Sequence, residues 1–221
     1  MKETTSVFEN RTHAGQLLVP MLQDLLDRKP EFSYGVIVGV PKGGVVVAAQ
    51  VAKELNMPLD IMVTGKIMAP GGSNIVIGAV TERGRIFINQ PVVRALGLNE
   101  LDIEPEVEKV KDEIKSIANE YRQVIPRSDL SEKTVFIIDD NVVTGATMFA
   151  TLRGLWAERP ASVVVALPVA PAQTLNALTD FADEVVALQA PTRLTEDIEN
   201  YYTTKKDVNQ QHVMEILRSL S

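Results

Sequence analysis

Cysteine is absent from this chain of 221 residues. Without a thiol, the chain can form no disulfide, no thiolate metal site and no cysteine nucleophile. A chain that needs no disulfides fits a reducing compartment. Histidine is nearly absent as well, since the sequence holds only His13 and His212, near opposite ends of the chain. We expect both at the surface or in packing, rather than as a catalytic or metal-binding pair.

Long hydrophobic runs are also missing. The longest apolar stretches lie near Val45–Ala52 and Val163–Ala172, and both are far shorter than the roughly 20 residues that a membrane-spanning helix needs. The first ten residues, MKETTSVFEN, are polar and lack the apolar core of a secretory signal. We therefore expect a cytoplasmic protein that does not associate with a membrane.

Positive charge is in the minority. The chain has 22 lysine and arginine residues against 29 aspartate and glutamate residues, which gives a net charge of −7. No compact basic run stands out, so the sequence predicts neither nucleic-acid binding nor attachment to an anionic membrane as the main activity. This balance still allows a local basic pocket for a small phosphorylated ligand.

Three common enzyme motifs do not occur in the sequence. There is no GxxxxGK[ST] phosphate loop, no GxGxxG dinucleotide loop and no GxSxG nucleophile elbow. Each motif places a glycine-rich turn or a nucleophile at the end of a strand, and the corresponding enzyme classes fit this chain poorly without it.

What the chain does have is an alternation of short apolar runs with helical patterns, which is typical of an α/β fold with a parallel sheet. The expected strands are Tyr34–Val40, Leu59–Thr64, Thr134–Ile138, Ser162–Leu167 and Glu184–Leu188. The expected helices are His13–Arg28, Val45–Leu55, Asp102–Val124, Thr147–Trp156, Gln173–Phe181 and a last one with Val213, Ile216, Leu217 and Leu220 facing inward. The length suits one domain, so we predict a single doubly wound α/β domain over residues 1–221 with a mainly parallel sheet.

Three segments are expected to decorate this domain. Residues 75–89 are predicted to form a β-hairpin around the turn TERG, after an irregular, glycine-rich stretch at Lys66–Asn74. Residues 102–124 are predicted to form a long amphipathic helix with a charged outer face. Its apolar stripe is a predicted homodimer surface, although the stripe could equally pack on the chain's own sheet. Residues 191–221 are expected to form an irregular hood and a C-terminal helix.

Two loops follow buried strands at the carboxyl edge of the expected sheet, where ligands bind in open parallel sheets. The first, Pro41-Lys42-Gly43-Gly44, combines a lysine charge with glycines that let a ligand approach the backbone, although two glycines can also form a simple tight turn. The second, Asn141–Thr147, supplies backbone N–H groups and two threonine hydroxyls at the start of a helix. That arrangement is typical of phosphate binding.

Asp139 and Asp140 stand between a buried strand and the second loop. Neighbouring carboxylates can accept hydrogen bonds from vicinal sugar hydroxyls, hold a divalent metal or stabilise a developing cation. A sugar that carries a 5-phosphate and reacts at its anomeric carbon could use all three, while Lys42 and its loop receive a second phosphate group. A lone aspartate at a strand end is common, but a pair followed by Thr-Gly-Ala-Thr is far more specific. Lys66, by contrast, could as easily be a solvated lysine.

The stretch VFIIDDNVVTGAT, residues 135–147, resembles the hallmark of type I phosphoribosyltransferases. That hallmark is a hydrophobic strand, two acidic residues and a Thr-Gly-x-Thr loop that binds 5-phosphoribosyl-1-pyrophosphate (PRPP). The stretches GVPKGGVVVAAQVAKELNMPLDIMVTGKIMAP and IGAVTERG are similar to a bacterial and archaeal branch of predicted phosphoribosyltransferases of unknown substrate. The resemblance covers nearly the whole chain. It implies the type I fold and a transferase that uses PRPP and Mg²⁺ to transfer 5-phosphoribosyl to an acceptor, with release of pyrophosphate.

The resemblance also implies a role for each matching position. Asp139 and Asp140 would bind the ribose hydroxyls, directly or through Mg²⁺, and stabilise positive charge on the sugar. Lys66 would contact pyrophosphate next to a flexible loop that runs to about Gly78. The remaining PRPP-binding positions are Lys42, Gly43 and Gly44 in the pyrophosphate loop, and Val143, Thr144, Gly145, Ala146 and Thr147 in the 5-phosphate loop.

Two positions depart from the family pattern. Lys42 stands where many relatives have arginine, which keeps the charge but loses the bidentate fork. Asn141 replaces a commoner glycine, and asparagine tolerates a left-handed backbone better than most residues. These departures leave open a PRPP-binding sensor or regulator without catalysis, and a scaffold whose chemistry has been lost. The expected acceptor is a small molecule, usually a nitrogenous base, on which Tyr201 or Tyr202 could stack, although a tyrosine pair could equally pack.

Overall fold

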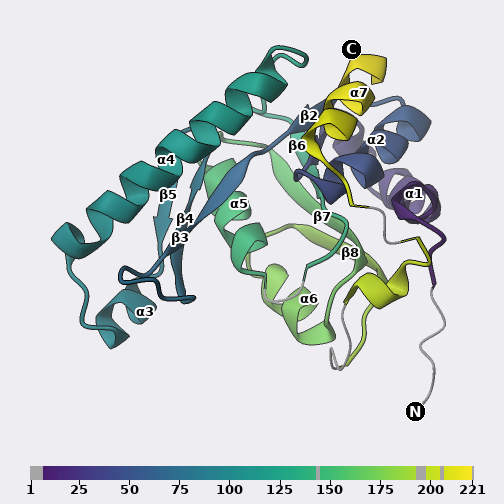
Figure 1. The fold of residues 1–221 in the computed structure, drawn as a ribbon. Coiled ribbons are helices and arrows are strands. Elements are labelled where there is room, and N and C mark those ends of the chain that lie inside the picture. Colours follow the sequence, from purple (N-terminus) through teal and green to yellow (C-terminus); the bar gives the residue numbers. More distant parts are fainter. Residues whose placement is uncertain (1–6, 143–144, 193–197, 205–206, 221) are drawn as a thin grey trace.

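The computed structural model describes residues 7–142, 145–192, 198–204 and 207–220. Its core is a five-stranded parallel sheet in the order β2-β1-β6-β7-β8 (Figure 1). The strands are β1 (Gly35–Gly39), β2 (Leu59–Ile61), β6 (Thr134–Ile138), β7 (Ser162–Val169) and β8 (Glu184–Gln189). Counted along the chain within this sheet, the order is 2-1-3-4-5, a doubly wound arrangement whose switch point lies between β1 and β6. The predicted α/β fold class is confirmed.

Helices cover both faces of this sheet, which explains why its strands are apolar on both sides. Helices α1 (Arg11–Arg28) and α2 (Gly43–Leu55) pack on the face that carries Ile37, Phe136 and Val164. Helix α5 (Ala146–Trp156) packs on the opposite face, which carries Val36 and Val135, and α6 (Ala172–Leu178) lies on that side as well. Successive strand residues therefore enter two separate apolar layers.

A second, antiparallel sheet interrupts the core sheet between β2 and β6. It consists of β3 (Thr64–Met68), β4 (Val76–Thr81) and β5 (Ile86–Ile88), in that order. The β4–β5 hairpin confirms the prediction, but the irregular stretch predicted from Lys66 is wrong at its start. Lys66 lies in β3 and pairs with Ala79, because the short run around Ile67 gains its partner only from the hairpin that follows. Helix α3 (Gln90–Ala95) follows the sheet and was not predicted.

Helix α4 (Glu100–Arg122) crosses the three-stranded sheet (Figure 1). Its buried residues are Ile103, Val107, Val110, Ile114, Ala118 and Tyr121. A methyl group at Gly65 of β3 would lie 2.5 Å from Val110 and 2.6 Å from Ile114, so helix and sheet are in close contact. The stripe is thus covered by the chain's own sheet, and a homodimer would need another surface. None of the described helices, α4 included, combines the length and apolar character needed to cross a membrane.

A buried ionic cluster ties the inserted sheet and α4 to the core. It comprises Asp60, Glu82, Arg83, Arg122 and Glu158. Arg122 Nη1 lies 2.6 Å from Asp60 Oδ1, and Arg122 also contacts Glu82. Arg83 joins Asp60, at 3.4 Å, to Glu158, at 3.2 Å. Because Asp60 belongs to β2 and is fully buried, the cluster fixes the insertion to the edge of the core sheet.

A segment near the N-terminus meets the segment that precedes α7 beside the core. Phe8 forms a parallel bridge with Tyr202, and the amides of Val7 and Phe8 donate to the carbonyl of Tyr201. The C-terminal part holds the short 3₁₀ helix η2 (Ile198–Tyr201) and α7 (Gln210–Leu220), while a similar turn, η1 (Pro30–Ser33), follows α1. In α7, Val213 and Leu217 are buried as predicted, but Leu220 is exposed because it lies at the last turn of the helix.

Candidate functional site

The ends of β1 and β6 open onto one pocket. The two strands are adjacent and in register, with Gly39 paired to Ile138, so the loops after them start side by side. The pocket has a volume of about 280 Å³. It is lined by Val40, Pro41, Lys66, Asp139, Asp140, Asn141, Val142, Gly145, Thr147 and Met148. It therefore brings together five of the predicted site residues: Lys66 from β3, and Asp139, Asp140, Gly145 and Thr147 from the stretch between β6 and the first turn of α5.

The remaining predicted residues lie around this pocket or outside the described chain. Lys42 is exposed and occupies the N-cap position of α2. The peptide bond between Pro41 and Lys42 is cis. Ala146 is the first residue of α5. Val143 and Thr144 lie outside the described residues.

Gly43 and Gly44 allow α2 to begin against the two aspartates. A methyl group at Gly43 would lie 2.2 Å from Asp140 Oδ2, and one at Gly44 would lie 2.7 Å from the Asp139 Cα. Neither distance is sterically allowed for a side chain, so both positions need glycine. The pyrophosphate loop predicted from sequence is thus also the place where the helix and the acidic pair are closest.

Two long helices present open N-termini to the pocket region. Asn10, Asn99 and Asn209 accept hydrogen bonds from first-turn amides of α1, α4 and α7. The N-cap residues of α2 and α5, Lys42 and Gly145, make no such side-chain bond. The first amides of a helix are donors without helical partners, and together with the helix dipole they favour an anion. Helix α6, with Pro171 at its N-cap, also lacks such a bond, but α2 and α5 are the uncapped helices that follow the predicted phosphate loops.

Gly145 has the left-handed backbone, φ +76°, that glycine adopts most readily. A methyl group there would also lie 2.5 Å from the ring of Phe149. The glycine of Thr-Gly-Ala-Thr is therefore required by both its conformation and its surroundings.

The two aspartates have different partners. Asp140 Oδ2 accepts a hydrogen bond from Arg11 Nε at 2.7 Å, and both side chains are largely buried. Asp139 Oδ1 accepts from the backbone N–H of Asp140 at 2.9 Å. Loss of hydration raises the pKa of the Asp139 carboxyl well above its usual range, and the adjacent charge of Asp140 raises it further. A positive charge nearby, such as a bound cation, would favour the ionised form of this carboxyl.

Arg11 is a site residue that the sequence did not reveal. It is the first residue of α1 and lies 129 positions from its partner Asp140. No periodicity or motif relates two residues at that separation. The N-cap pattern at Asn10 predicts where the helix starts, but it gives no sign of what the next side chain contacts.

Tyr202 contacts the backbone of the acidic pair. Its hydroxyl donates to the backbone carbonyl of Asp140 at 2.6 Å, its ring lies 5.3 Å from that of Phe8, and only 2% of the residue is exposed. Burial raises its pKa far above the ordinary tyrosine value. Tyr202 is thus enclosed and offers no free face to a base, whereas Tyr201 is only half-buried.

A divalent cation is compatible with this donor set. Within the described residues, no three His, Asp or Glu side chains gather as a complete metal site. Mg²⁺ usually keeps several waters and binds one or two carboxylates together with substrate phosphates. Asp139 and Asp140, both on the wall of a pocket near the uncapped N-termini of α2 and α5, fit that mode of binding.

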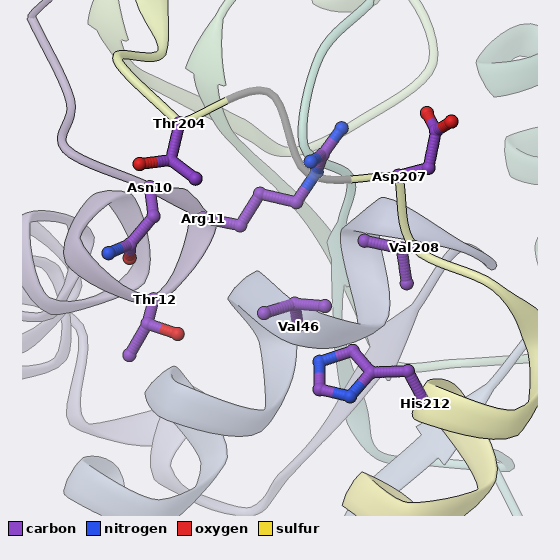
Figure 2. A pocket seen from close by; sticks show the side chains of 8 residues that line it. All are labelled: Asn10, Arg11, Thr12, Val46, Thr204, Asp207, Val208 and His212. Atoms are coloured by element: carbon purple, nitrogen blue, oxygen red, sulfur yellow. The ribbon is translucent and has the colours of Figure 1, made fainter.

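A second pocket, of about 230 Å³, lies beside Arg11 (Figure 2). It is lined by Asn10, Arg11, Thr12, Val46, Thr204, Asp207, Val208 and His212. Figure 2 shows Arg11 extending across this pocket, with Val46 of α2 beneath it in the view and His212 of α7 at one side. His13 lies elsewhere, where its ring accepts from the amide of Glu9.

Comparison with known proteins gives a consistent result. The profile of the phosphoribosyl transferase domain matches residues 13–192. A protein of Mycobacterium tuberculosis strain H37Rv, provisionally named a phosphoribosyl transferase, is 33% identical over 185 residues. The match covers 84% of this chain but only 41% of the mycobacterial protein, so the chain spans less than half the length of that relative.

Solved structures agree on the fold. The crystal structure of TT1426 from Thermus thermophilus is similar with a TM-score of 0.85 and 34% identity, over 97% of this chain and 99% of that one. The structure of the AQ2163 protein from Aquifex aeolicus has a TM-score of 0.50 at 13% identity, over 88% of this chain and 86% of that one. At so low an identity the second likeness concerns the fold alone.

Proposed function

Because this chain belongs to the phosphoribosyltransferase family, we propose that it transfers a 5-phosphoribosyl group from PRPP to a nitrogenous acceptor and releases pyrophosphate. One observation carries the proposal: Lys66, Asp139, Asp140 and Thr147 line a single pocket at the switch point of the sheet. Ligands bind at that point in doubly wound folds. Action in the cytoplasm is part of the proposal and rests on the absence of cysteine.

PRPP carries two anionic ends, and the site offers two anion-binding helix starts. The 5-phosphate would lie at the N-terminus of α5, held by the amides after Gly145, by Thr147 and by Val143 and Thr144. The pyrophosphate would lie at the N-terminus of α2, near Lys42 and the two glycines. Lys66 reaches the same pocket from β3 and would add a positive charge. The ribose would then lie between them, over the acidic pair.

In the proposed reaction, the bond between C1 and the pyrophosphate oxygen breaks, and its electron pair leaves with pyrophosphate. A lone pair of the acceptor nitrogen then forms the new bond to C1, and the proton that this nitrogen gives up passes to solvent. Asp139 and Asp140 would accept hydrogen bonds from the ribose hydroxyls and offset the positive charge that develops on the sugar. When bound between the acidic pair and the substrate, Mg²⁺ would neutralise charge on the leaving group.

The acceptor would enter from the side where the segment at Phe8 meets the segment at Tyr202. Tyr201 is the half-buried aromatic residue there, and it remains the proposed contact for a planar base. Tyr202 would contribute indirectly, since its hydroxyl holds the backbone of Asp140. Nothing in the described residues favours the alternative of a sensor that binds PRPP without transfer.

Calorimetric titration of PRPP, with and without Mg²⁺, tests this proposal. We expect saturable binding that Mg²⁺ strengthens and that the double variant Asp139→Asn/Asp140→Asn loses. Asp112→Asn serves as the control, because Asp112 is exposed on the outer face of α4. If the folded wild-type protein gives no binding heat at any workable concentration, the proposal is wrong. If PRPP binds, release of pyrophosphate can be followed with a panel of bases to identify the acceptor.

A further inference from the structure

We propose that Arg11 is a substrate-positioning residue that competes with the divalent cation for Asp140. In the free protein its guanidinium holds the Asp140 carboxylate. When PRPP arrives with a cation, the cation takes that carboxylate and Arg11 turns to the pyrophosphate group. The second half of this inference rests on the proposed function, whereas the first concerns the free protein alone.

The contact itself is close and largely buried. Arg11 Nε lies 2.7 Å from Asp140 Oδ2, with 17% of the arginine side chain and 11% of the aspartate side chain exposed. A carboxylate removed from water needs a counterion, and leaving it without one is strongly unfavourable. Arg11 supplies that charge here. Any cation that binds through the same oxygen atom must displace the guanidinium or accept a second positive charge at contact distance.

Arg11 also lies at the loop proposed to hold pyrophosphate. A methyl group at Gly43 would lie 2.7 Å from Arg11 Nε, so the arginine reaches the first residue of α2. A guanidinium binds phosphate oxygens through two parallel hydrogen bonds, which an ammonium group cannot do. With Lys42, the loop itself has no side chain that can donate two parallel hydrogen bonds to phosphate. Arg11, from a distant part of the chain, places such a donor pair beside the loop.

Arg11 starts from a fixed backbone position, and its side chain lines an open pocket. The residue is the first of α1, directly after the capping residue Asn10, and its guanidinium lies 5.4 Å from the centre of the Tyr202 ring. The pocket of about 230 Å³ in Figure 2 opens beside it. Thr204 and Asp207 on its wall provide hydrogen-bond acceptors for a guanidinium that has left Asp140. Exchange of partners thus requires a change in side-chain rotamer and no movement of the helix.

The test compares Arg11→Gln, Arg11→Lys and Lys42→Gln with wild type by calorimetry, using Mn²⁺ alone and pyrophosphate alone as probes. We expect Arg11→Gln to bind Mn²⁺ about tenfold more tightly than wild type and pyrophosphate about tenfold more weakly, the scale of one charge-assisted hydrogen bond. Arg11→Lys keeps a counterion for Asp140, so its Mn²⁺ affinity should stay near that of wild type while its pyrophosphate affinity falls. The ion pair at Asp140 is made by Arg11, so Lys42→Gln removes a nearby positive charge but leaves that pair intact, and it should not reproduce the gain in Mn²⁺ affinity.

Three results would overturn the inference. One is an unchanged or weaker Mn²⁺ affinity in Arg11→Gln, and another is an equal gain in Lys42→Gln, which would indicate a general charge effect. The third is full pyrophosphate affinity in Arg11→Gln. Circular dichroism shows whether each variant is folded. If Arg11→Gln does not fold, the pyrophosphate affinity of Arg11→Lys is the test. If wild type fails to bind PRPP while Arg11→Gln still gains Mn²⁺ affinity, the proposed function is wrong but the competition at Asp140 stands.

Discussion

Asp139 occupies a position where a charged carboxylate opposes folding. Poor hydration and the neighbouring Asp140 both raise its pKa, so the folded protein holds the Asp139 proton more tightly than the unfolded chain does. Its contribution to stability is therefore present at low pH and is lost as the pH rises through the raised pKa. A residue retained at such a cost is typical of a functional site.

We predict that Asp139→Asn stabilises the free protein at neutral pH. Asparagine keeps an oxygen that can accept from the Asp140 amide but carries no charge, and we expect a gain on the order of 1 kcal/mol in the free energy of unfolding. Urea denaturation at pH 7 in the presence of EDTA measures it. The difference from wild type should shrink as the pH is lowered, and Asp112→Asn should change little. A variant less stable than wild type at pH 7 would contradict this account of the site.

Because Tyr202 is buried, we predict that the protein loses stability at alkaline pH. Because burial raises the pKa of Tyr202, the stability that the neutral phenol contributes is complete below pH ~10, the ordinary tyrosine value, and is lost as the pH rises toward the folded-state pKa. Tyr202→Phe should cost about 1 kcal/mol at pH 7, through the lost bond to the Asp140 carbonyl, yet decline less steeply above pH 10. Tyr34→Phe is the control, since Tyr34 is 67% exposed. Urea midpoints between pH 7 and 11 that fall in parallel for wild type and Tyr202→Phe would refute the prediction.

The sequence could predict those site residues that lie close together along the chain. Asp139, Asp140 and Thr147 are neighbours in one motif, so their shared pocket followed from a strand and the loop after it. Lys66 was found through a family resemblance. Arg11 was not found, because its contact with Asp140 is made only by the folded chain and no local pattern specifies it.

At the scale of elements, the ionic cluster decides whether the inserted sheet stays in register with the core. Arg122 ends α4 and touches both Asp60 of β2 and Glu82 after β4, so one side chain joins three elements. Lys66 lies on β3 of this inserted sheet, and its place in the pocket depends on that attachment.

We predict that Arg122→Met destabilises the protein by roughly 3–5 kcal/mol, because it leaves the buried carboxylates of Asp60 and Glu82 without their shared counterion. Arg28→Met is the matched control. Arg28 pairs with Asp24 on the outside of α1, where 61% and 70% of the two side chains are exposed, and its loss should cost less than about 1 kcal/mol. Chemical denaturation of both variants gives the comparison. Equal effects would mean that the cluster does not hold the insertion.

Elements with strong local patterns were predicted best. The bounds of β6 match the prediction residue for residue, since an apolar run between charged residues has clear ends. The sequence predicts an irregular stretch from Lys66, whereas the structure has strand β3 there, because only pairing with β4 makes it a strand. The α4 stripe was correctly identified as apolar, but periodicity does not say whether the covering surface belongs to the same chain, and here it does.

For the whole molecule, the pairing of residues near 8 with residues near 202 places both segments beside the candidate site. Phe8 and Tyr202 share a small apolar cluster with Ala14 and Val169, directly beneath the acidic pair. Local patterns predicted the doubly wound core, but the pairing of residues near 8 with residues near 202 carries no such pattern and appears only in the structure.

We predict that Phe8→Ala lowers the free energy of unfolding by about 3–5 kcal/mol and weakens PRPP binding as well, because the cavity loosens Tyr202 and with it Asp140. Val7→Ala is the matched control, since Val7 precedes Phe8 but is 39% exposed. Thermal denaturation and PRPP calorimetry report the two effects. If Phe8→Ala lost stability but bound PRPP as tightly as wild type, the contact between Phe8 and Tyr202 would serve stability alone.

The uncapped N-termini of α2 and α5 also bear on how the protein should be handled. An oxyanion in the buffer, such as phosphate or sulfate, can occupy the same amides as a substrate phosphate. A ligand that binds only the folded state stabilises it by about 2.7 kcal/mol at 100 times its dissociation constant. Melting temperatures measured in phosphate should therefore exceed those measured in a zwitterionic buffer, and affinities for PRPP measured in phosphate should be too weak by the extent of that competition.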